Sequence, residues 1–227
     1  MVISMLVSVN YSDFLDFVIP LNLCQFDEII VLTVKSDIAC KKVCEKYDKV
    51  RCLIFDDLVL KTNGKNFNKG ALYNKGLEYL DSINYSDWLV FTDADILFPD
   101  NFKQMVKNLE FKKRVLYTLH RYDCETYDVY KKYTETKDMS LLGDRYYCPF
   151  AGYCQIFIYE PTKMPVVEIG EGNVYDWIHL RRFGRPRLRL RKNQDVFKFL
   201  SNTEFVIHLG QAHLNIAGRI TGEYFDE

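Results

Sequence analysis

The feature that most constrains the fold is the alternation of short apolar runs with amphipathic segments over the first hundred residues. Strand-like runs and helical patterns alternate near residues 2–9, 13–24, 28–34, 37–47, 50–55, 68–83 and 87–92. Continuous apolar strands separated by helices are typical of a parallel sheet covered on both faces. The sequence therefore predicts an α/β fold with a Rossmann-like, mainly parallel central sheet flanked by helices.

The pattern is less regular beyond residue 98. The elements expected there are a tyrosine-rich stretch from His120 to Tyr147, a strand from Tyr153 to Tyr159, a helix near 173–183 and a strand from Glu204 to His208. The tyrosine-rich stretch fits either an acceptor-binding loop or a docked helix hairpin. No repeat or low-complexity linker separates the two halves. We expect a single domain over 1–227, with a nucleotide-binding half at 1–98 and a smaller donor-sugar and acceptor half at 99–227.

Charge and cysteine content narrow the environment and the partners. The net charge of -1 gives no global field that would attract nucleic acid, so no nucleic-acid partner is expected. The seven cysteines contain no CxxC pair, which suits reduced thiols. No basic leader and no apolar stretch near the ~18 residues of a membrane span is present. We expect a cytoplasmic protein without a transmembrane segment, in the host cytoplasm if the source is viral, and a place within a multidomain chain stays open.

Polar side chains follow each of the four expected strands at the point where it ends. They are Asn10 and Tyr11, the run 35–37, the pair 56–57 and the run 93–95. Ligands of such sheets bind beyond the carboxyl ends of the strands. Three of the four sets contain carboxylates, which implies that a cation accompanies any anionic ligand.

The strongest of these sets is Asp93-Ala94-Asp95, which follows an apolar run. One carboxylate can bind Mn²⁺ or Mg²⁺, while the other fixes a ribose hydroxyl or a water, and the small Ala94 lets a ligand approach closely. Pro99 is placed for the first turn of a new helix. An Asp-x-Asp alone is a weak signal, and its alternative is a solvated loop.

The run 91–95, preceded by residues 68–77, resembles the GT-A glycosyltransferases with their DxD motif. Among these it is similar to family 2-like enzymes and to small glycosyltransferase domains of large algal viruses, and the order of elements agrees along the whole chain. The resemblance implies a metal-dependent glycosyltransferase of the hexosyltransferase type, with Mn²⁺ or Mg²⁺ as cofactor. It would move a sugar from a nucleotide diphosphate donor, a UDP-sugar, to a hydroxyl of a glycan or glycoprotein acceptor in glycan biosynthesis.

The resemblance also assigns the metal and the base. Asp95 would bind the metal, Asp93 the ribose or the metal through water, and His208 would complete the metal shell; the alternative for His208 is a hydrogen-bonded core histidine. Asp176 would be the general base, with Arg182 six positions later, although Tyr175 replaces the acid that usually precedes it. A base on the face opposite the diphosphate predicts inversion at the anomeric carbon.

The nucleotide subsite is expected over the first strand. Val9, Asn10 and Tyr11 would meet the base and ribose, with Tyr11 stacking on uracil, and Asp37 resembles the acid that pairs with the uracil N–H.

Three further positions complete the implied donor site. Lys69 resembles a basic residue that meets the base or diphosphate, with an exposed helix lysine as the alternative, and Asn74 lies on the same expected helix. Gly152 resembles the glycine under the donor sugar, with an ordinary strand start as the alternative. The basic block at 181–192 fits a diphosphate lid, a lipid contact or a solvated edge.

The sequence leaves three rival functions to be weighed. A sugar-nucleotide pyrophosphorylase would need a glycine-rich phosphate loop after the first strand, and residues 9–12 contain none. A non-catalytic carbohydrate- or nucleotide-binding module of a larger enzyme would bind its ligand without metal. A retaining transferase is distinguished by the stereochemistry of its product.

Overall fold

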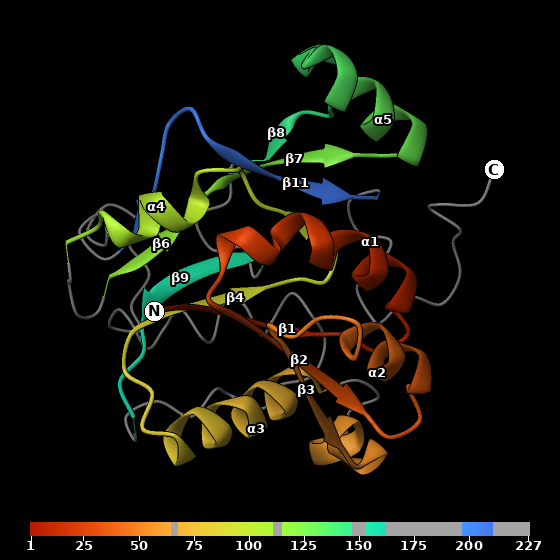
Figure 1. Ribbon diagram of the computed structural model, residues 1–227, viewed down its shortest axis with the longest axis vertical. Helices are drawn as coiled ribbons and strands as arrows, with labels where there is room; N and C mark the ends of the chain where they lie inside the picture. Colours follow the sequence, from red (N-terminus) through yellow and green to blue (C-terminus); the bar gives the residue numbers. More distant parts are fainter. Residues whose placement is uncertain (65–67, 111–114, 147–152, 162–196, 211–227) are drawn as a thin grey trace.

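The computed structural model describes residues 1–64, 68–110, 115–146, 153–161 and 197–210 (Figure 1). The helices are α1 (Ser12–Asn22), η1 (Leu23–Gln25), α2 (Ile38–Cys44), η2 (Asp57–Gly64), α3 (Lys69–Ser82), α4 (Phe102–Lys107), α5 (Tyr127–Thr136) and η3 (Met139–Leu141). The strands are β1 (Val2–Val7), β2 (Glu28–Val34), β3 (Val50–Phe55), β4 (Trp88–Thr92), β5 (Ile96–Leu97), β6 (Leu116–Thr118), β7 (His120–Cys124), β8 (Arg145–Tyr146), β9 (Cys154–Ile158), β10 (Phe197–Phe199) and β11 (Phe205–Leu209).

The central sheet has seven strands in the order β10-β6-β9-β4-β1-β2-β3. The pairs of β1 with β2, β1 with β4 and β2 with β3 are parallel, while β9 runs antiparallel to both of its neighbours, β4 and β6. The predicted mixed α/β fold with a mainly parallel sheet is confirmed. The carboxyl ends of β1, β2 and β4 lie at one edge of this sheet, which brings the loops after these strands together.

Alternation along the strands divides the core between the two faces of the sheet. Val2 and Leu6 of β1 pack with α1, α2 and α4, whereas Ile3 and Met5 pack on the opposite face with α3. Figure 1 shows α1 and α4 on one side of the sheet and α3 on the other. Because successive side chains of a strand point to opposite faces, a continuous apolar run suits burial on both.

Side-chain caps fix where two of these helices begin. The Asp37 carboxylate accepts a hydrogen bond from Cys40 N at 3.0 Å at the start of α2, and Asn68 does the same for Ala71 N at 3.0 Å at the start of α3. Such caps satisfy backbone donors that the first helical turn leaves unpaired. The two caps place Asp37 and Lys69, the first residue of α3, at the edge of the sheet where the strands end.

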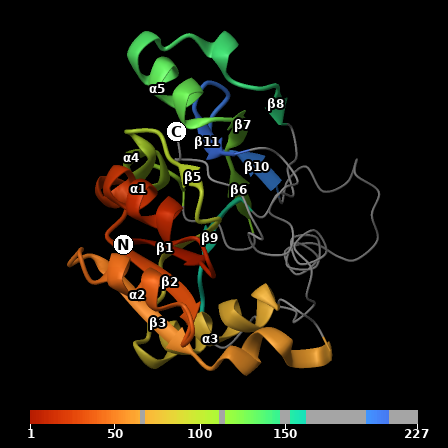
Figure 2. The same cartoon turned by 90° about the vertical axis from the view of Figure 1, so that its right-hand side faces the viewer.

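A smaller sheet, in the order β5-β11-β7-β8, lies beside the central one. Figures 1 and 2 show it at the end of the molecule away from α3, with α5 on its outer side. The described part of the tyrosine-rich stretch thus contributes two strands, β7 and β8, and two helices, α5 and η3. β11 joins this smaller sheet and pairs in parallel with β7 and antiparallel with β5.

The helix predicted to begin at Pro99 is present as α4, but it begins later in the chain. Ile96 and Leu97 form the short strand β5, and α4 begins three residues beyond Pro99, at Phe102. Pro99 instead supplies the carbonyl that accepts from Phe102 N at 3.0 Å, which closes the turn before the helix. None of the helices in the described part of the chain is both long enough and apolar enough to span a membrane.

Candidate active site

The loop that carries Asp93 and Asp95 is held by hydrogen bonds on both sides. At its start, Tyr73 of α3 donates to the Thr92 carbonyl at 3.1 Å, and the Thr92 hydroxyl donates to the Tyr153 carbonyl at 2.9 Å. At its end, the buried Asn22 amide donates to the Ile96 carbonyl at 2.8 Å and accepts from Phe98 N at 3.0 Å. The loop therefore presents its carboxylates from a fixed backbone.

Asp95 and His208 meet through the pairing of β5 with β11. This pairing places His208 opposite Ile96, and Leu209 N donates to the Asp95 carbonyl at 2.9 Å. The His208 Nε2 atom lies 3.5 Å from Asp95 Oδ2, and both side chains are buried. The other carboxylate oxygen, Oδ1, is buried without a hydrogen-bond partner from another of the described residues.

This arrangement perturbs both groups. Burial disfavours the imidazolium, but the carboxylates of Asp95 and Asp123 more than offset it and raise the pKa of His208 to about 9. For Asp95, burial raises the pKa, but the charge of His208 and its hydrogen bond outweigh burial, so the pKa is lowered overall. Without a metal, the pair is thus an imidazolium facing a carboxylate.

The pair fits a hard divalent cation. Two adjacent ligand atoms, each ~2.0–2.1 Å from one octahedral ion, lie about 3 Å apart. The observed distance between His208 Nε2 and Asp95 Oδ2 is close to this, at 3.5 Å. The unpartnered Oδ1 adds a lone pair, and the imidazole can bind once it loses its proton. Within the described ranges, no group of three or more His, Cys, Asp or Glu side chains is placed to hold a metal. Water and substrate phosphates would complete the shell, as is usual for Mg²⁺.

Asp93 is more exposed than Asp95 and has a different partner. Its side chain is 34% exposed and forms an ion pair with the Lys69 ammonium group. That ammonium also lies 5.8 Å from the centroid of the Tyr73 ring. The predicted Lys69 thus lies beside the predicted Asp93, at the amino end of a 14-residue helix whose dipole favours an anion.

The loop after β1 is fastened by Asp37. Asn10 has a positive φ of 64° and donates from its backbone N–H to Asp37 Oδ2 at 2.8 Å. The same oxygen lies 3.5 Å from the Thr33 hydroxyl, and the other caps α2. Asp37 therefore supports the loop of residues 9–11; that it also pairs with a uracil N–H stays a prediction.

The remaining predicted site residues have the following positions. Val9 and Asn74 are partly buried, and the Tyr11 ring is tilted against Phe14 with its centroid 5.9 Å away. Ala94 is buried in the core between α1 and the sheet. Gly152, Asp176, Arg182 and the basic block lie outside the described residues.

Sequence reasoning missed Arg121 and Asp123, which lie on the same face of β7. Asp123 Oδ1 is 2.9 Å from His208 Nδ1 and 2.9 Å from Arg121 Nε. Burial raises the pKa of the Asp123 carboxyl, but the contacts with His208 and Arg121 lower it overall. The sequence does contain a signal for this pair. Arg121 and Asp123 have opposite charges and are two positions apart in the run His120–Cys124, and residues two apart in a strand lie on the same face.

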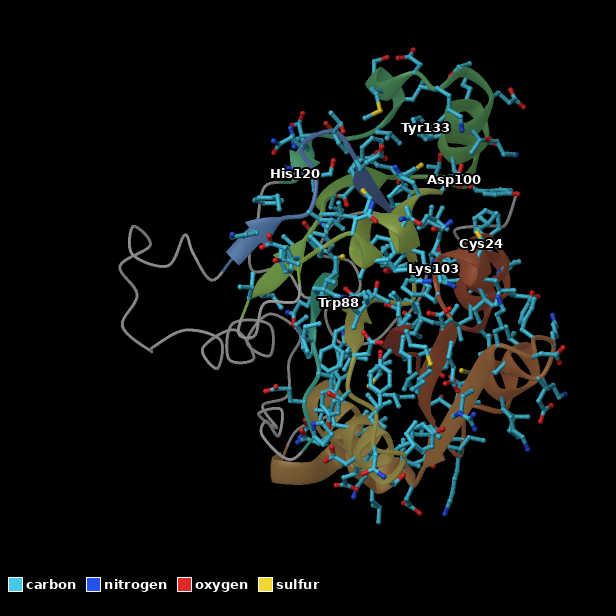
Figure 3. All side chains as sticks on the ribbon, turned by 60° about the vertical axis from the view of Figure 1, so that its left-hand side comes forward. Cys24, Trp88, Asp100, Lys103, His120 and Tyr133 are labelled. Carbon is cyan, nitrogen blue, oxygen red and sulfur yellow. The ribbon has the colours of Figure 1, made fainter. Side chains whose placement is uncertain are left out.

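A different histidine shows that burial alone does not mark the site. His120, labelled in Figure 3, stacks on the Phe199 ring with centroids 3.9 Å apart. Burial and the charge of Arg145 lower its pKa to about 4, so it is neutral at physiological pH.

The sequence matches the model of one protein family. The model of glycosyl transferase family 2 matches residues 10–166, well over half of the 227 residues. The matched range contains the loops after β1, β2 and β4. The chain therefore belongs to glycosyl transferase family 2. Among curated proteins, none matches its sequence.

Several solved structures are similar in chain trace. One is the inositol-1-phosphate CTP transferase from T. maritima, with 10% identity and a TM-score of 0.46 over 93% of this chain and 90% of that one. The galactosyltransferase LgtC, solved with donor and acceptor sugar analogues, has 15% identity and a TM-score of 0.38, with 69% and 57% covered. A 4-diphosphocytidyl-2C-methyl-D-erythritol synthase from Anaerococcus prevotii DSM 20548 has 17% identity and a TM-score of 0.38, with 55% and 56% covered. The chain spans little more than half the length of the last two.

Proposed function

We propose that the chain is a divalent-metal-dependent glycosyltransferase that moves a hexose from a UDP-sugar to a hydroxyl of a glycan or glycoprotein acceptor, with inversion. The observation that supports this most is the buried Asp95 carboxylate, which has one unpartnered oxygen and the other 3.5 Å from His208 Nε2. The carboxylate supplies the oxygen donor that Mn²⁺ or Mg²⁺ prefers, and the imidazole nitrogen favours Mn²⁺, the softer of the two ions. The reaction is expected in the cytoplasm.

The ion, when bound, supplies Lewis-acid stabilisation of the charge that develops on the leaving diphosphate. Asp95 and His208 would hold it. Lys69 brings a positive charge to the amino end of α3, where the helix dipole also favours a phosphate. Asp93 would hold a ribose hydroxyl or a water, since its carboxylate is partly exposed and already paired with Lys69.

Residues 9–11 would form the floor for the base, held in place by the hydrogen bond from Asn10 N to Asp37. The proton of the attacking hydroxyl would pass to Asp176, on the face of the sugar opposite the diphosphate. That assignment rests on the resemblance in sequence, as does the choice of a UDP donor. A general base of this kind contributes roughly 10²- to 10⁴-fold in rate.

The experiment is a thermal-shift titration with UDP, GDP, CDP and dTDP, each with and without Mn²⁺. One diphosphate at about 100 times its Kd should stabilise the wild type by ~2.7 kcal/mol, or roughly 5–10 °C for a chain of this size, only when Mn²⁺ is present. Asp95→Asn, which keeps the side-chain volume, should lose this shift. Asp100→Asn, an exposed carboxylate five positions later, should keep it.

Two results would contradict the proposal. One is the absence of stabilisation by all four diphosphates with Mn²⁺, and the other is an equal shift in the wild type and in Asp95→Asn. Inversion is checked separately, by the anomeric configuration of the product in a proton NMR spectrum.

A further inference from the structure

The two ring nitrogens of His208 face two different carboxylates. Nε2 lies 3.5 Å from Asp95 Oδ2, and Nδ1 lies 2.9 Å from Asp123 Oδ1. The second contact arises because β7 and β11 pair in parallel with Asp123 directly opposite His208. The distance is that of a hydrogen bond, although the ring N–H does not point straight at the oxygen in this conformation.

Asp123 cannot share an ion with the Nε2 atom of His208. The two nitrogens of an imidazole direct their bonds away from each other, so a group in contact with Nδ1 lies behind the ring as seen from the metal. A carboxylate at Nδ1 instead requires a proton there. That proton fixes the tautomer in which the Nε2 lone pair is available to a metal.

Asp123 is itself held in place. Arg121 Nε lies 2.9 Å from Asp123 Oδ1, and an Arg121 NH2 group donates to Asp123 Oδ2 at 3.4 Å. The guanidinium lies 5.0 Å from the centroid of the Tyr153 ring, whose hydroxyl donates to the Leu119 carbonyl at 2.9 Å. The side chains of Arg121, Asp123 and His208 are 12%, 15% and 9% exposed. Arg121 therefore contacts both oxygens of the Asp123 carboxylate, including Oδ1, the oxygen that faces His208.

We infer that Asp123 is a positioning residue, which fixes the orientation and tautomer of His208 so that Nε2 faces the Asp95 carboxylate. Arg121 holds the Asp123 carboxylate in place. The inference rests on the proposed function, because the benefit of orienting the ring is that Nε2 can bind a divalent cation. The predicted tautomer of His208, with a proton on Nδ1 and none on Nε2, can be tested without any metal.

The first measurement is the tautomer of His208 in long-range proton–nitrogen NMR spectra of ¹⁵N-histidine-labelled protein. The chain has only four histidines, so the rings can be assigned by substitution. In metal-free protein well above pH 9, where most His208 rings have lost one proton, the remaining proton should be on Nδ1. Asp123→Ala should move the population toward the Nε2-protonated form. A wild-type ring protonated on Nε2 would overturn the inference, whatever the metal result.

The second measurement is Mn²⁺ affinity in the presence of saturating UDP, by calorimetry. Asp123→Ala should weaken binding by about 10- to 100-fold, the usual cost of losing a carboxylate behind a metal-binding histidine. Asp123→Asn, whose amide oxygen can still accept from Nδ1, should recover part of this loss and serves as the folded variant if Asp123→Ala does not fold. Asp100→Ala is the control and should bind as the wild type does.

The two proposals fail in different ways. A wild type that binds no Mn²⁺ but has the proton on Nδ1 would refute the metal-dependent function and leave the positioning role of Asp123 in place. A wild type that binds Mn²⁺ with the same affinity as folded Asp123→Ala and Asp123→Asn would refute the positioning role and leave the function in place.

Discussion

Metal binding at His208 should release a proton, and the amount can be worked out from the structure. The pKa of this imidazole is raised to about 9, so at pH 7.5 the ring is almost fully protonated in the metal-free protein. Because a metal binds only the neutral ring, each ion bound should release about one proton. A histidine with an ordinary pKa of ~6.5 would release only about 0.1 proton at the same pH.

The raised pKa of His208 also determines how the affinity for Mn²⁺ depends on pH. Below the pKa, the apparent affinity for Mn²⁺ should rise about tenfold per pH unit, since the neutral fraction of the ring rises by that factor. It should level off near pH 9. An unperturbed histidine would give an affinity that is already constant above about pH 7.5.

Calorimetry in two buffers of different protonation enthalpy measures the released proton directly. Saturating UDP is present throughout, and His208→Gln in the same buffers gives the protons that come from UDP itself. A difference of about one proton per ion between wild type and His208→Gln is the expected result. A difference near zero at pH 7.5, together with a constant affinity from pH 7 to 8.5, would refute the assignment of His208 as a ligand that exchanges a proton for the metal.

Two further predictions concern stability. A folded pKa of about 9 for His208, above its unfolded value of ~6.5, contributes stability that is fully present below pH 6.5 and is lost as pH rises through 9. The metal-free wild type should therefore lose about 3 kcal/mol more than His208→Gln between pH 6.5 and 10 in urea unfolding; equal losses would contradict the ion pair. Asn22→Ala removes both hydrogen bonds that bracket β5 and should cost about 2–5 kcal/mol, because it leaves two buried backbone groups unpaired. A loss below 1 kcal/mol in the same assay, similar to that of the exposed control Leu21→Ala, would show that water replaces the amide.

The parts of this fold that the sequence predicts are those determined by local pattern. The apolar runs that become β1, β2 and β4 are buried on both faces, and β3 is the partly exposed edge strand of the sheet. The period of α3 matches its burial on one face. The Asp93 to Asp95 loop follows β4 as predicted. These features depend on residues that are near one another in the chain.

The parts that the sequence does not predict depend on contacts between distant segments. Ile207 pairs with Leu97, and no local signal marks the two residues of β5 as a strand. The meeting of His208 with Asp95 was expected from resemblance and not from spacing. Asp123 was missed because its role exists only where β7 lies beside β11.

The order in which the chain is synthesised gives the pairing of β5 with β11 a consequence for folding. A growing chain that has emerged through Ile158 holds β1, β2, β4 and β9, and so most of the central sheet with the Asp93 to Asp95 loop. It does not yet hold His208, whose strand lies more than a hundred residues after the loop it completes. An ion bound tightly between Asp95 and His208 is therefore expected to report that β11 has docked. Tight Mn²⁺ binding would then serve as a test of complete folding in truncated or circularly permuted forms of the chain.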